Sequence, residues 1–268
     1  MTTQQQPLRK LYYWPARGRG EQIRIILSDA GMPFEDVTWD ASKGEAAKQE
    51  FFKMCKGLGG HTTTNIPMLE EGGKFYTQSS AIIRKIGRDA KLYTGTYEED
   101  MLIATVEDLR SANYKAMSMF GATDKAIKSY IDVVLPKHLR NLERLLLSTE
   151  GLYLLGNDAC VADLTLYDAL HVAERQVPGV LSKYPRVKLF FDTVEGRPGV
   201  KKWVASDQRK KLMAFPSVVK TTPQKVDGDS RCPWPFIYFH DPATGLRDWQ
   251  TWLVAGLATA WYFTARSR

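Results

Sequence analysis

The pattern that decides the fold lies in residues 11–31, LYYWPARGRGEQIRIILSDAG. It opens with a short apolar and aromatic run that ends at Pro15, which is typical of a buried strand. From Arg19 apolar residues recur at the spacing of an amphipathic helix, at Ile23, Ile26, Leu27 and Ala30. Gly31 follows as a helix-ending residue. The stretch therefore predicts a strand that runs directly into a helix.

Further strands and a second helix are predicted downstream. Residues 34–39 form a second strand pattern, and Ile66-Pro67 opens a third. The turn Glu71-Gly72-Gly73-Lys74 predicts a hairpin into a fourth strand, after which Ser79 or Ser80 caps a helix. The order strand-helix-strand, then strand-strand-helix, predicts a small mixed sheet with helices packed on it, as in the thioredoxin fold.

Helical periodicity replaces the strand signals from about Tyr97 to Phe215, which predicts a helical bundle. Residues 216–245 are rich in proline, glycine and polar residues, as in an extended linker. We therefore predict an α/β thioredoxin-like domain over residues 1–92 and an all-α domain over residues 93–215. The linker and a membrane-anchoring helix within residues 246–268 would follow.

The composition limits the function classes. The chain has 268 residues, 44% of them hydrophobic, and a formal net charge of +7, but its basic residues are scattered. This argues against a nucleic-acid surface. Three cysteines without a CxxC pair and four histidines without metal-ligand spacing predict no disulfide framework and no metal site, and they fit a reducing compartment. The N-terminus lacks the apolar core of a secretory signal.

Six short motifs, in their order along the chain, make a family resemblance. They are Tyr12–Glu21, Trp39, Ile66-Pro67, Gln78–Ile82, Glu107–Arg110, and Gly156-Asn157 with Ala162-Asp163. With them the chain resembles the sigma- and pi-type cytosolic glutathione transferases from residue 10 to about residue 207. Each motif alone is weak, whereas six in sequence are specific. The resemblance implies glutathione as the substrate, and a homodimer or a hetero-complex formed through this fold.

The chemistry of such a protein requires a donor for the thiolate of glutathione. A free thiol has a pKa of about 8.5, and a hydrogen bond to the charged form lowers it. The resemblance implies Tyr13 as that donor, the alternative being a core aromatic residue. Tyr12 would point to the opposite face of the strand and serve in packing. Arg17 would add positive potential near the sulfur, or else is a surface charge at the start of the helix.

The resemblance also assigns the rest of the glutathione site. Gln78 and Ser79, at a helix N-terminus, would hold the γ-glutamyl carboxylate, and the alternative is a simple N-cap. Pro67 would follow a cis peptide bond, with the Met68 backbone facing the cysteinyl part. Sequence alone does not establish a cis bond.

Three more residues complete this set. Trp39 and Lys43 would lie near the glycyl carboxylate, with Lys48 as a competitor of Lys43. Asp108 would reach the ammonium of glutathione across a dimer interface. The electrophile pocket would involve Tyr114, Met117, Met119 and Phe120.

Two departures from the family pattern stand out. The stretch 44–64 is longer than the equivalent loop, so it would reshape the entrance or bind another protein. Cys160 stands where the family places the Ser or Thr of a helix cap, and sulfur is a poor acceptor. Asp163 is a candidate to compensate.

The segment Trp252–Phe263 is apolar apart from Thr259, which indicates a buried or lipid setting, and counted from Trp249 the span has fifteen residues. At about 1.5 Å per residue it would reach about 22 Å, short of a hydrocarbon core of about 30 Å. Its flanking aromatic residues and arginines resemble membrane-interface anchors. We favour a membrane helix over the alternative, a helix packed as a lid on the protein.

Two functions follow from these observations. The first is a glutathione transferase that uses the thiolate for attack on an electrophile or for isomerisation. The alternative is a non-catalytic accessory subunit of a membrane complex, for example a mitochondrial respiratory one, with the transferase fold as a scaffold. The tail would place the protein at a mitochondrial or endoplasmic reticulum membrane, and without it a cytoplasmic protein is expected.

Overall fold

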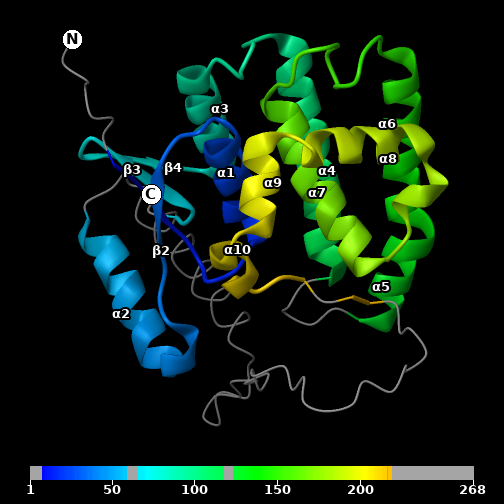
Figure 1. Ribbon diagram of the computed structural model, residues 1–268. Coiled ribbons are helices and arrows are strands. Elements are labelled where there is room, and N and C mark those ends of the chain that lie inside the picture. Colours follow the sequence, from blue (N-terminus) through cyan, green and yellow to red (C-terminus); the bar gives the residue numbers. More distant parts are fainter. Residues whose placement is uncertain (1–7, 59–64, 118–122, 216, 219–268) are drawn as a thin grey trace, which may run out of the picture. The chain divides into compact units, whose positions relative to one another are not determined.

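The computed structural model describes residues 8–58, 65–117, 123–215 and 217–218, and its first part is built on a mixed sheet (Figure 1). The strands are β1 (Arg9–Tyr12), β2 (Phe34–Val37), β3 (Met68–Glu71) and β4 (Lys74–Thr77). They lie in the order β2-β1-β3-β4, with β1 parallel to β2 and antiparallel to β3, and β3 antiparallel to β4. The predicted mixed sheet is confirmed.

Side-chain alternation divides the strands between two apolar clusters. Leu11 and Leu69 join the main core beneath α1 (Gly18–Asp29) and α3 (Ser79–Ala90). Tyr12 and Met68 join a smaller cluster with α2 (Gly44–Gly57). Figure 1 accordingly shows α2 on one side of the sheet and α1 and α3 on the other. Because successive strand residues face opposite sides, Tyr12 is a packing residue, as predicted.

The remaining elements are helical. They are η1 (Ala41–Lys43), α4 (Tyr97–Met117), α5 (Asp124–Ser129), the π-helical turn η2 (Tyr130–Val134), α6 (Leu135–Ser148), α7 (Val161–Gln176), η3 (Leu181–Lys183), α8 (Pro185–Glu195), α9 (Pro198–Ala205) and α10 (Asp207–Lys211). Helix α4 packs on α7, and α1 packs on both α7 and α9. The main core runs through both parts, and the predicted domain boundary at residue 92 falls between α3 and α4.

The N-terminus of α7 shows how the chain accommodates Cys160. The Asp163 carboxylate accepts hydrogen bonds from the backbone N–H groups of Cys160 and Leu154, both at 2.8 Å. One carboxylate therefore satisfies two backbone donors at a buried helix end, beside a cysteine whose sulfur is a weak acceptor.

Several details differ from the sequence-based expectations. The third strand begins at Met68 rather than at Ile66-Pro67, and helix α2 occupies most of the stretch 44–64 that was expected to be a loop. The second strand ends at Val37, because Trp39 turns into an aromatic cluster with Trp14 and Phe51. Neither Ser79 nor Ser80 caps α3, because Ser79 is already the first helical residue and Gln78 takes the cap position. The first helix begins one residue earlier than expected, at Gly18.

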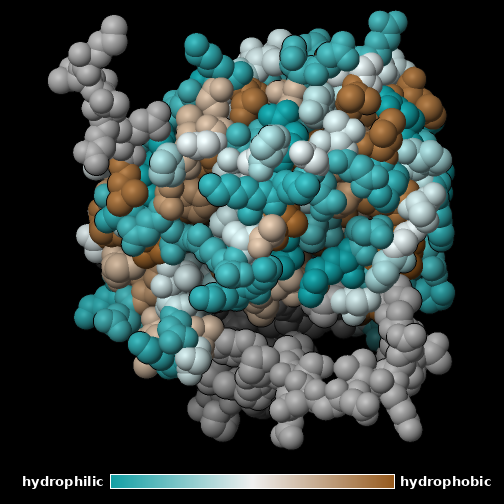
Figure 2. All heavy atoms as spheres, viewed as in Figure 1, coloured by the Kyte–Doolittle hydropathy of each residue, from teal (hydrophilic) through white to brown (hydrophobic). Residues whose placement is uncertain are grey.

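The predicted linker and tail lie outside the described residues, apart from residues 217–218. Within the described ranges, no helix is both long and apolar enough to cross a membrane. The face drawn in Figure 2 is mostly polar, with apolar groups on the side of α6 and α8.

Candidate functional site

Tyr13 lies immediately after β1, against the first turn of α1. Its hydroxyl accepts a hydrogen bond of 2.8 Å from the backbone N–H of Arg19, and the residue is 8% exposed. The approach is so close that a Cβ at Gly18 would lie 2.7 Å from the hydroxyl, and one at Gly20 would lie 2.5 Å from the ring. Only glycine therefore fits at these two positions without moving the phenol.

The environment of Tyr13 keeps its hydroxyl protonated. Burial raises the pKa of the phenol, and the hydrogen bond from Arg19 and the charges of Arg24, Arg19 and Arg110 offset part of this effect. The oxygen accepts from Arg19, and the structure gives its proton no acceptor among the described residues. A protonated tyrosine hydroxyl can donate a hydrogen bond to a ligand, and it does not act as a base.

A cavity of about 540 Å³ is lined by Trp14, the residue that follows Tyr13, and by Arg19, whereas Tyr13 itself is not in the lining. The lining residues are Trp14, Arg19, Phe52, Asn65, Ile66, Pro67, Gln78, Ser79, Ser80 and Glu107. Its volume and its mixture of apolar walls with a few polar groups are typical of a small-molecule site. Three predicted residues, Pro67, Gln78 and Ser79, are in this lining, and Arg19 connects it to the Tyr13 hydroxyl.

One wall of the cavity is the N-terminus of α3. Gln78 precedes the helix with φ of 67°, an unusual conformation for a residue other than glycine. No side chain caps the helix, although the backbone N–H groups of Ala81 and Ile82 bond to the Gln78 carbonyl. The first N–H groups of α3 and the helix dipole therefore face the cavity where Ser79 and Ser80 line it, which favours an anion.

A second wall follows from the Ile66-Pro67 peptide bond, which is cis. Both residues line the cavity. Met68, in contrast, is the first residue of β3, where it pairs with Tyr12 and Thr77, and its side chain is buried on the α2 side of the sheet. The lining on this wall therefore includes Ile66 and Pro67 but not Met68.

Aromatic residues form a third wall. Trp14 and Phe52 line the cavity, and their rings are 5.4 Å apart. Trp39 stands behind them, 5.0 Å from Trp14 and 5.9 Å from Phe52. The ammonium of Lys48 lies 5.8 Å from the Trp14 ring, whereas Lys43 is exposed and outside the lining. Lys48 is also outside the lining, but it contacts Trp14, a lining residue, and pairs with Glu45 at 3.1 Å.

The pair Arg19 and Glu107 is a part of the site that sequence reasoning missed. The Arg19 guanidinium bonds to Glu107 at 2.5 Å and lies 5.4 Å from the Tyr114 ring. Ser111 donates to the same carboxylate at 3.0 Å. The sequence signal for this ion pair was that Arg19 and Glu107, which have opposite charges, each belong to one of the six family motifs.

Arg17 was expected either to add positive potential near the sulfur or to be a surface charge at the start of the helix. It is half-buried and lies outside the cavity lining, and burial followed by the charge of Arg209 lowers its pKa. Glu21, Arg175 and Asp168 are its other charged neighbours.

The remaining predicted residues are spread over α4. Asp108 is exposed on this helix, and Met117 is buried at its end. Tyr114 faces Arg19 and the ring of Phe215. Phe120 and Met119 lie outside the described residues. Among the described residues, no group of three or more potential ligands could hold a metal ion.

Comparisons with known proteins agree on one family. The family model for the glutathione S-transferase N-terminal domain matches residues 9–88, and that for the C-terminal domain matches residues 107–207. Glutathione S-transferase 1 of Ascaris suum is 31% identical over 209 residues, covering 74% of this chain and 96% of the relative.

Solved structures extend the similarity. The pi-class glutathione S-transferase of Onchocerca volvulus is 28% identical with a TM-score of 0.64, covering 73% of this chain and 91% of that one. Prostaglandin synthase D of Nilaparvata lugens is 25% identical with a TM-score of 0.60, covering 75% of this chain and 98% of that one. The names of the relatives favour an enzyme over the accessory-subunit alternative. The chain belongs to the glutathione S-transferase family.

Proposed function

We propose that this protein is a glutathione transferase that binds glutathione in the 540 Å³ cavity and stabilises its thiolate with the Tyr13 hydroxyl. The observation that carries the proposal is the state of that hydroxyl. Its oxygen accepts from the Arg19 N–H, and its proton has no acceptor among the described residues. A sulfur anion at the cavity edge would take that proton as a hydrogen bond.

The energetic requirement is modest. A thiol with a pKa of about 8.5 is only a few per cent ionised at neutral pH. A hydrogen bond to a charged group contributes about 1.5–3 kcal/mol. Since each pKa unit corresponds to about 1.36 kcal/mol, one such bond lowers the thiol pKa by about one to two units. That shift is enough to make the thiolate a major species at neutral pH.

Other groups of the protein suit the two carboxylates and the cysteinyl part of glutathione. The uncapped N-terminus of α3, with Gln78 and Ser79, suits the γ-glutamyl carboxylate. The Ile66 backbone suits the cysteinyl part more closely than that of Met68. Lys48, above Trp14, is a better candidate than Lys43 for the glycyl carboxylate.

In a dimer, Asp108 would be free to contact the ammonium of glutathione bound to the partner, because its side chain is exposed. Attack on an electrophile and isomerisation both use the same thiolate. Prostaglandin synthase D, the name of the Nilaparvata lugens relative, makes isomerisation worth assaying in parallel with conjugation.

Membrane attachment is a separate property that rests only on the apolar segment Trp249–Phe263. We retain it as a proposal about location, and with it the mitochondrial or endoplasmic reticulum membrane. The accessory-subunit alternative depends on the same segment.

The decisive experiment measures glutathione affinity by calorimetry and the pKa of the bound thiol by its ultraviolet absorbance. We expect Tyr13→Phe to keep most of the affinity and to raise the pKa of the bound thiol by about one to two units, because one hydrogen bond to the anion is lost.

Tyr12→Phe is the matched control. The Tyr12 hydroxyl donates to Glu70 at 2.7 Å on the other side of the sheet, so its removal should leave the thiol pKa unchanged. An unmodified protein with no measurable affinity for glutathione would contradict the proposal.

A further inference from the structure

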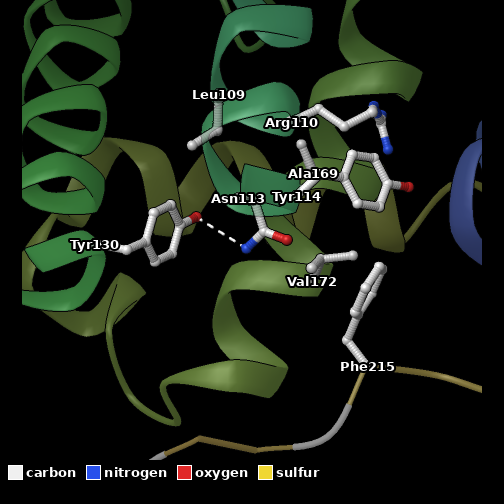
Figure 3. Close-up of a pocket in the computed structure, with 8 residues that line it drawn as sticks. All are labelled: Leu109, Arg110, Asn113, Tyr114, Tyr130, Ala169, Val172 and Phe215. Carbon is white, nitrogen blue, oxygen red and sulfur yellow. Dashed lines mark hydrogen bonds between the residues drawn. The ribbon is translucent and has the colours of Figure 1, made fainter. Parts of the chain in front are cut away.

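A second and much smaller cavity lies within the helical part of the chain (Figure 3). It is lined by Leu109, Arg110, Asn113, Tyr114, Tyr130, Ala169, Val172 and Phe215. Its volume of about 10 Å³ holds no more than one water molecule. An aromatic electrophile cannot enter this space as it stands, although most of its walls are apolar.

Phe215 is the residue that fills the space beside Tyr114. The two ring centroids are 5.5 Å apart with an interplanar angle of 57°, which is a favourable aromatic contact. In Figure 3 the Phe215 ring rises from the segment that follows α10 and points toward Tyr114 and Val172. Phe215 therefore makes the contacts that an aromatic ligand would otherwise make there.

The main chain on both sides of Phe215 is held in place. Its anchoring bonds are Met213 N–H to Pro15 O at 3.0 Å, Arg17 N–H to Met213 O at 2.9 Å, Arg175 Nε to Phe215 O at 2.8 Å, and Val218 N–H to Gln176 O at 3.0 Å. The Phe215 side chain itself is only half-buried. With the backbone anchored, the movement open to this residue is rotation of its side chain toward solvent.

Tyr114 connects this space to the proposed sulfur position. The Arg19 guanidinium lies 5.4 Å from the Tyr114 ring, and the Arg19 backbone N–H bonds to the Tyr13 hydroxyl. Tyr13 and Tyr114 are also close enough for the charge of one to raise the pKa of the other. An electrophile attacked by a sulfur at Tyr13 would therefore extend toward Tyr114 and Phe215.

We propose that Phe215 is a side-chain gate that determines the size of electrophile this protein accepts, an inference that rests on the proposed transferase function. With the ring in place, the site accepts small electrophiles. When the ring turns outward, the space beside Tyr114 receives an apolar aromatic substituent, which replaces Phe215 against the tyrosine. The class of ligand that this arrangement fits is an electrophile with more than one ring.

The test compares two glutathione derivatives that differ only in the group on sulfur, S-methylglutathione and S-naphthylmethylglutathione. Their dissociation constants are measured by calorimetry on the full chain. We expect Phe215→Ala to shift the ratio of the two constants about tenfold in favour of the naphthylmethyl derivative, since an apolar group gains or loses about this much in a hydrophobic pocket. The constant for S-methylglutathione should stay the same.

Met213→Ala is the matched control, because this residue belongs to the same segment, is 41% exposed and keeps its backbone bonds. It should leave the ratio unchanged. Phe215→Leu should shift the ratio in the same direction by a smaller factor, and it serves if the alanine variant fails to fold. If the Phe215 variants bind both ligands with an unchanged ratio of dissociation constants, the gate is wrong but the proposed function stands. Failure of the unmodified protein to bind S-methylglutathione would overturn the proposed function and the gate with it.

Discussion

The phenol of Tyr13 is held by shape as much as by hydrogen bonding. Gly18 and Gly20 let the first turn of α1 lie directly on its ring, and the Arg19 N–H between them fixes its hydroxyl. The group that orients the Tyr13 hydroxyl is thus the backbone of the next helix, so the position of the donor depends on glycines that take no part in the chemistry.

A substitution at Gly20 should therefore act on the proposed chemistry. In Gly20→Ala the new Cβ would lie 2.5 Å from the Tyr13 ring, so ring and helix must move apart. We expect a loss of stability of about 1–3 kcal/mol from overpacking, and a fall in kcat/KM of up to about 100-fold from misplacement of the donor. Chemical denaturation and steady-state conjugation kinetics measure the two effects.

Gly57→Ala provides the comparison for this variant. Gly57 ends α2, and an added Cβ there meets nothing within 4 Å. Its substitution should leave kcat/KM unchanged and raise stability by up to about 1 kcal/mol, because alanine loses less conformational entropy in a helix. Equal activity of Gly20→Ala and Gly57→Ala would refute the steric account.

His171 should make stability depend on pH. Burial, then the charges of Arg209, Arg17 and Arg175, lowers the pKa of this histidine from 6.5 to about 3. The folded protein therefore keeps it neutral, whereas the unfolded chain takes up a proton below about pH 6.5. By linkage, its contribution to stability is present above pH 6.5 and is lost as the pH falls toward 3, by at most about 1.4 kcal/mol per pH unit.

The measurement is the slope of the unfolding free energy against pH between pH 6 and pH 4, compared with His171→Gln. Glutamine offers the Arg209 guanidinium an acceptor, as the ring nitrogen does at 3.2 Å, and it does not titrate. In the variant the slope should decrease by the equivalent of about one proton taken up on unfolding, or about 1.4 kcal/mol per pH unit. Identical slopes would mean that carboxylates alone set the acid sensitivity.

At the scale of elements, local patterns predicted most of the fold. The period of the apolar residues after Arg19 predicted α1, and the paired glycines at Gly72 and Gly73 predicted the β3–β4 hairpin, where both have positive φ. The cap of α3 was assigned to the wrong residues, because Ser79 and Ser80 are common capping residues, and a polar residue with positive φ at Gln78 carries no sequence signal.

The sequence predicted the parts of the candidate site that are formed by short motifs, and it missed contacts between residues far apart in the chain. Pro67, Gln78 and Ser79 belong to short motifs, and all of them line the cavity. Arg19 and Glu107 are 88 residues apart, so their ion pair exists only once α1 and α4 are packed in the same fold. The contact of Phe215 with Tyr114 is non-local for the same reason.

The N-terminus of α7 should depend on Asp163 much more than on Cys160. Asp163→Ala should cost about 2–4 kcal/mol, because it removes a helix cap and leaves two buried backbone donors, those of Cys160 and Leu154, without a partner. Cys160→Ala should cost much less, since thiol sulfur is a weak acceptor. Urea denaturation of both variants measures the difference. If the cysteine variant loses as much as the aspartate variant, the carboxylate does not hold this helix end.

At the scale of the molecule, α1 is the element on which both parts of the chain converge. Buried Glu21 accepts from Arg209 at 2.5 Å and from the Trp203 ring nitrogen at 3.1 Å, so it connects α1 to α9 and α10. Next to it, Arg24 bonds to Asp36 on β2 at 2.9 Å. Tyr13 also packs on α1. Helix α1 therefore contacts both the proposed hydrogen-bond donor and the helices that precede the Phe215 segment.

The proposed membrane attachment through residues 249–263 can be tested directly. If Trp249–Phe263 enters a bilayer, the full chain should float with phospholipid vesicles in a density gradient. Leu253→Asp combined with Leu257→Asp should then abolish flotation, because a charged side chain within hydrocarbon costs about 2.5–3.5 kcal/mol on insertion scales. Glutathione affinity should be the same in both proteins. If the tail is instead a lid on the protein, the full chain stays out of the lipid fraction, and the double variant lowers the unfolding temperature or the glutathione affinity.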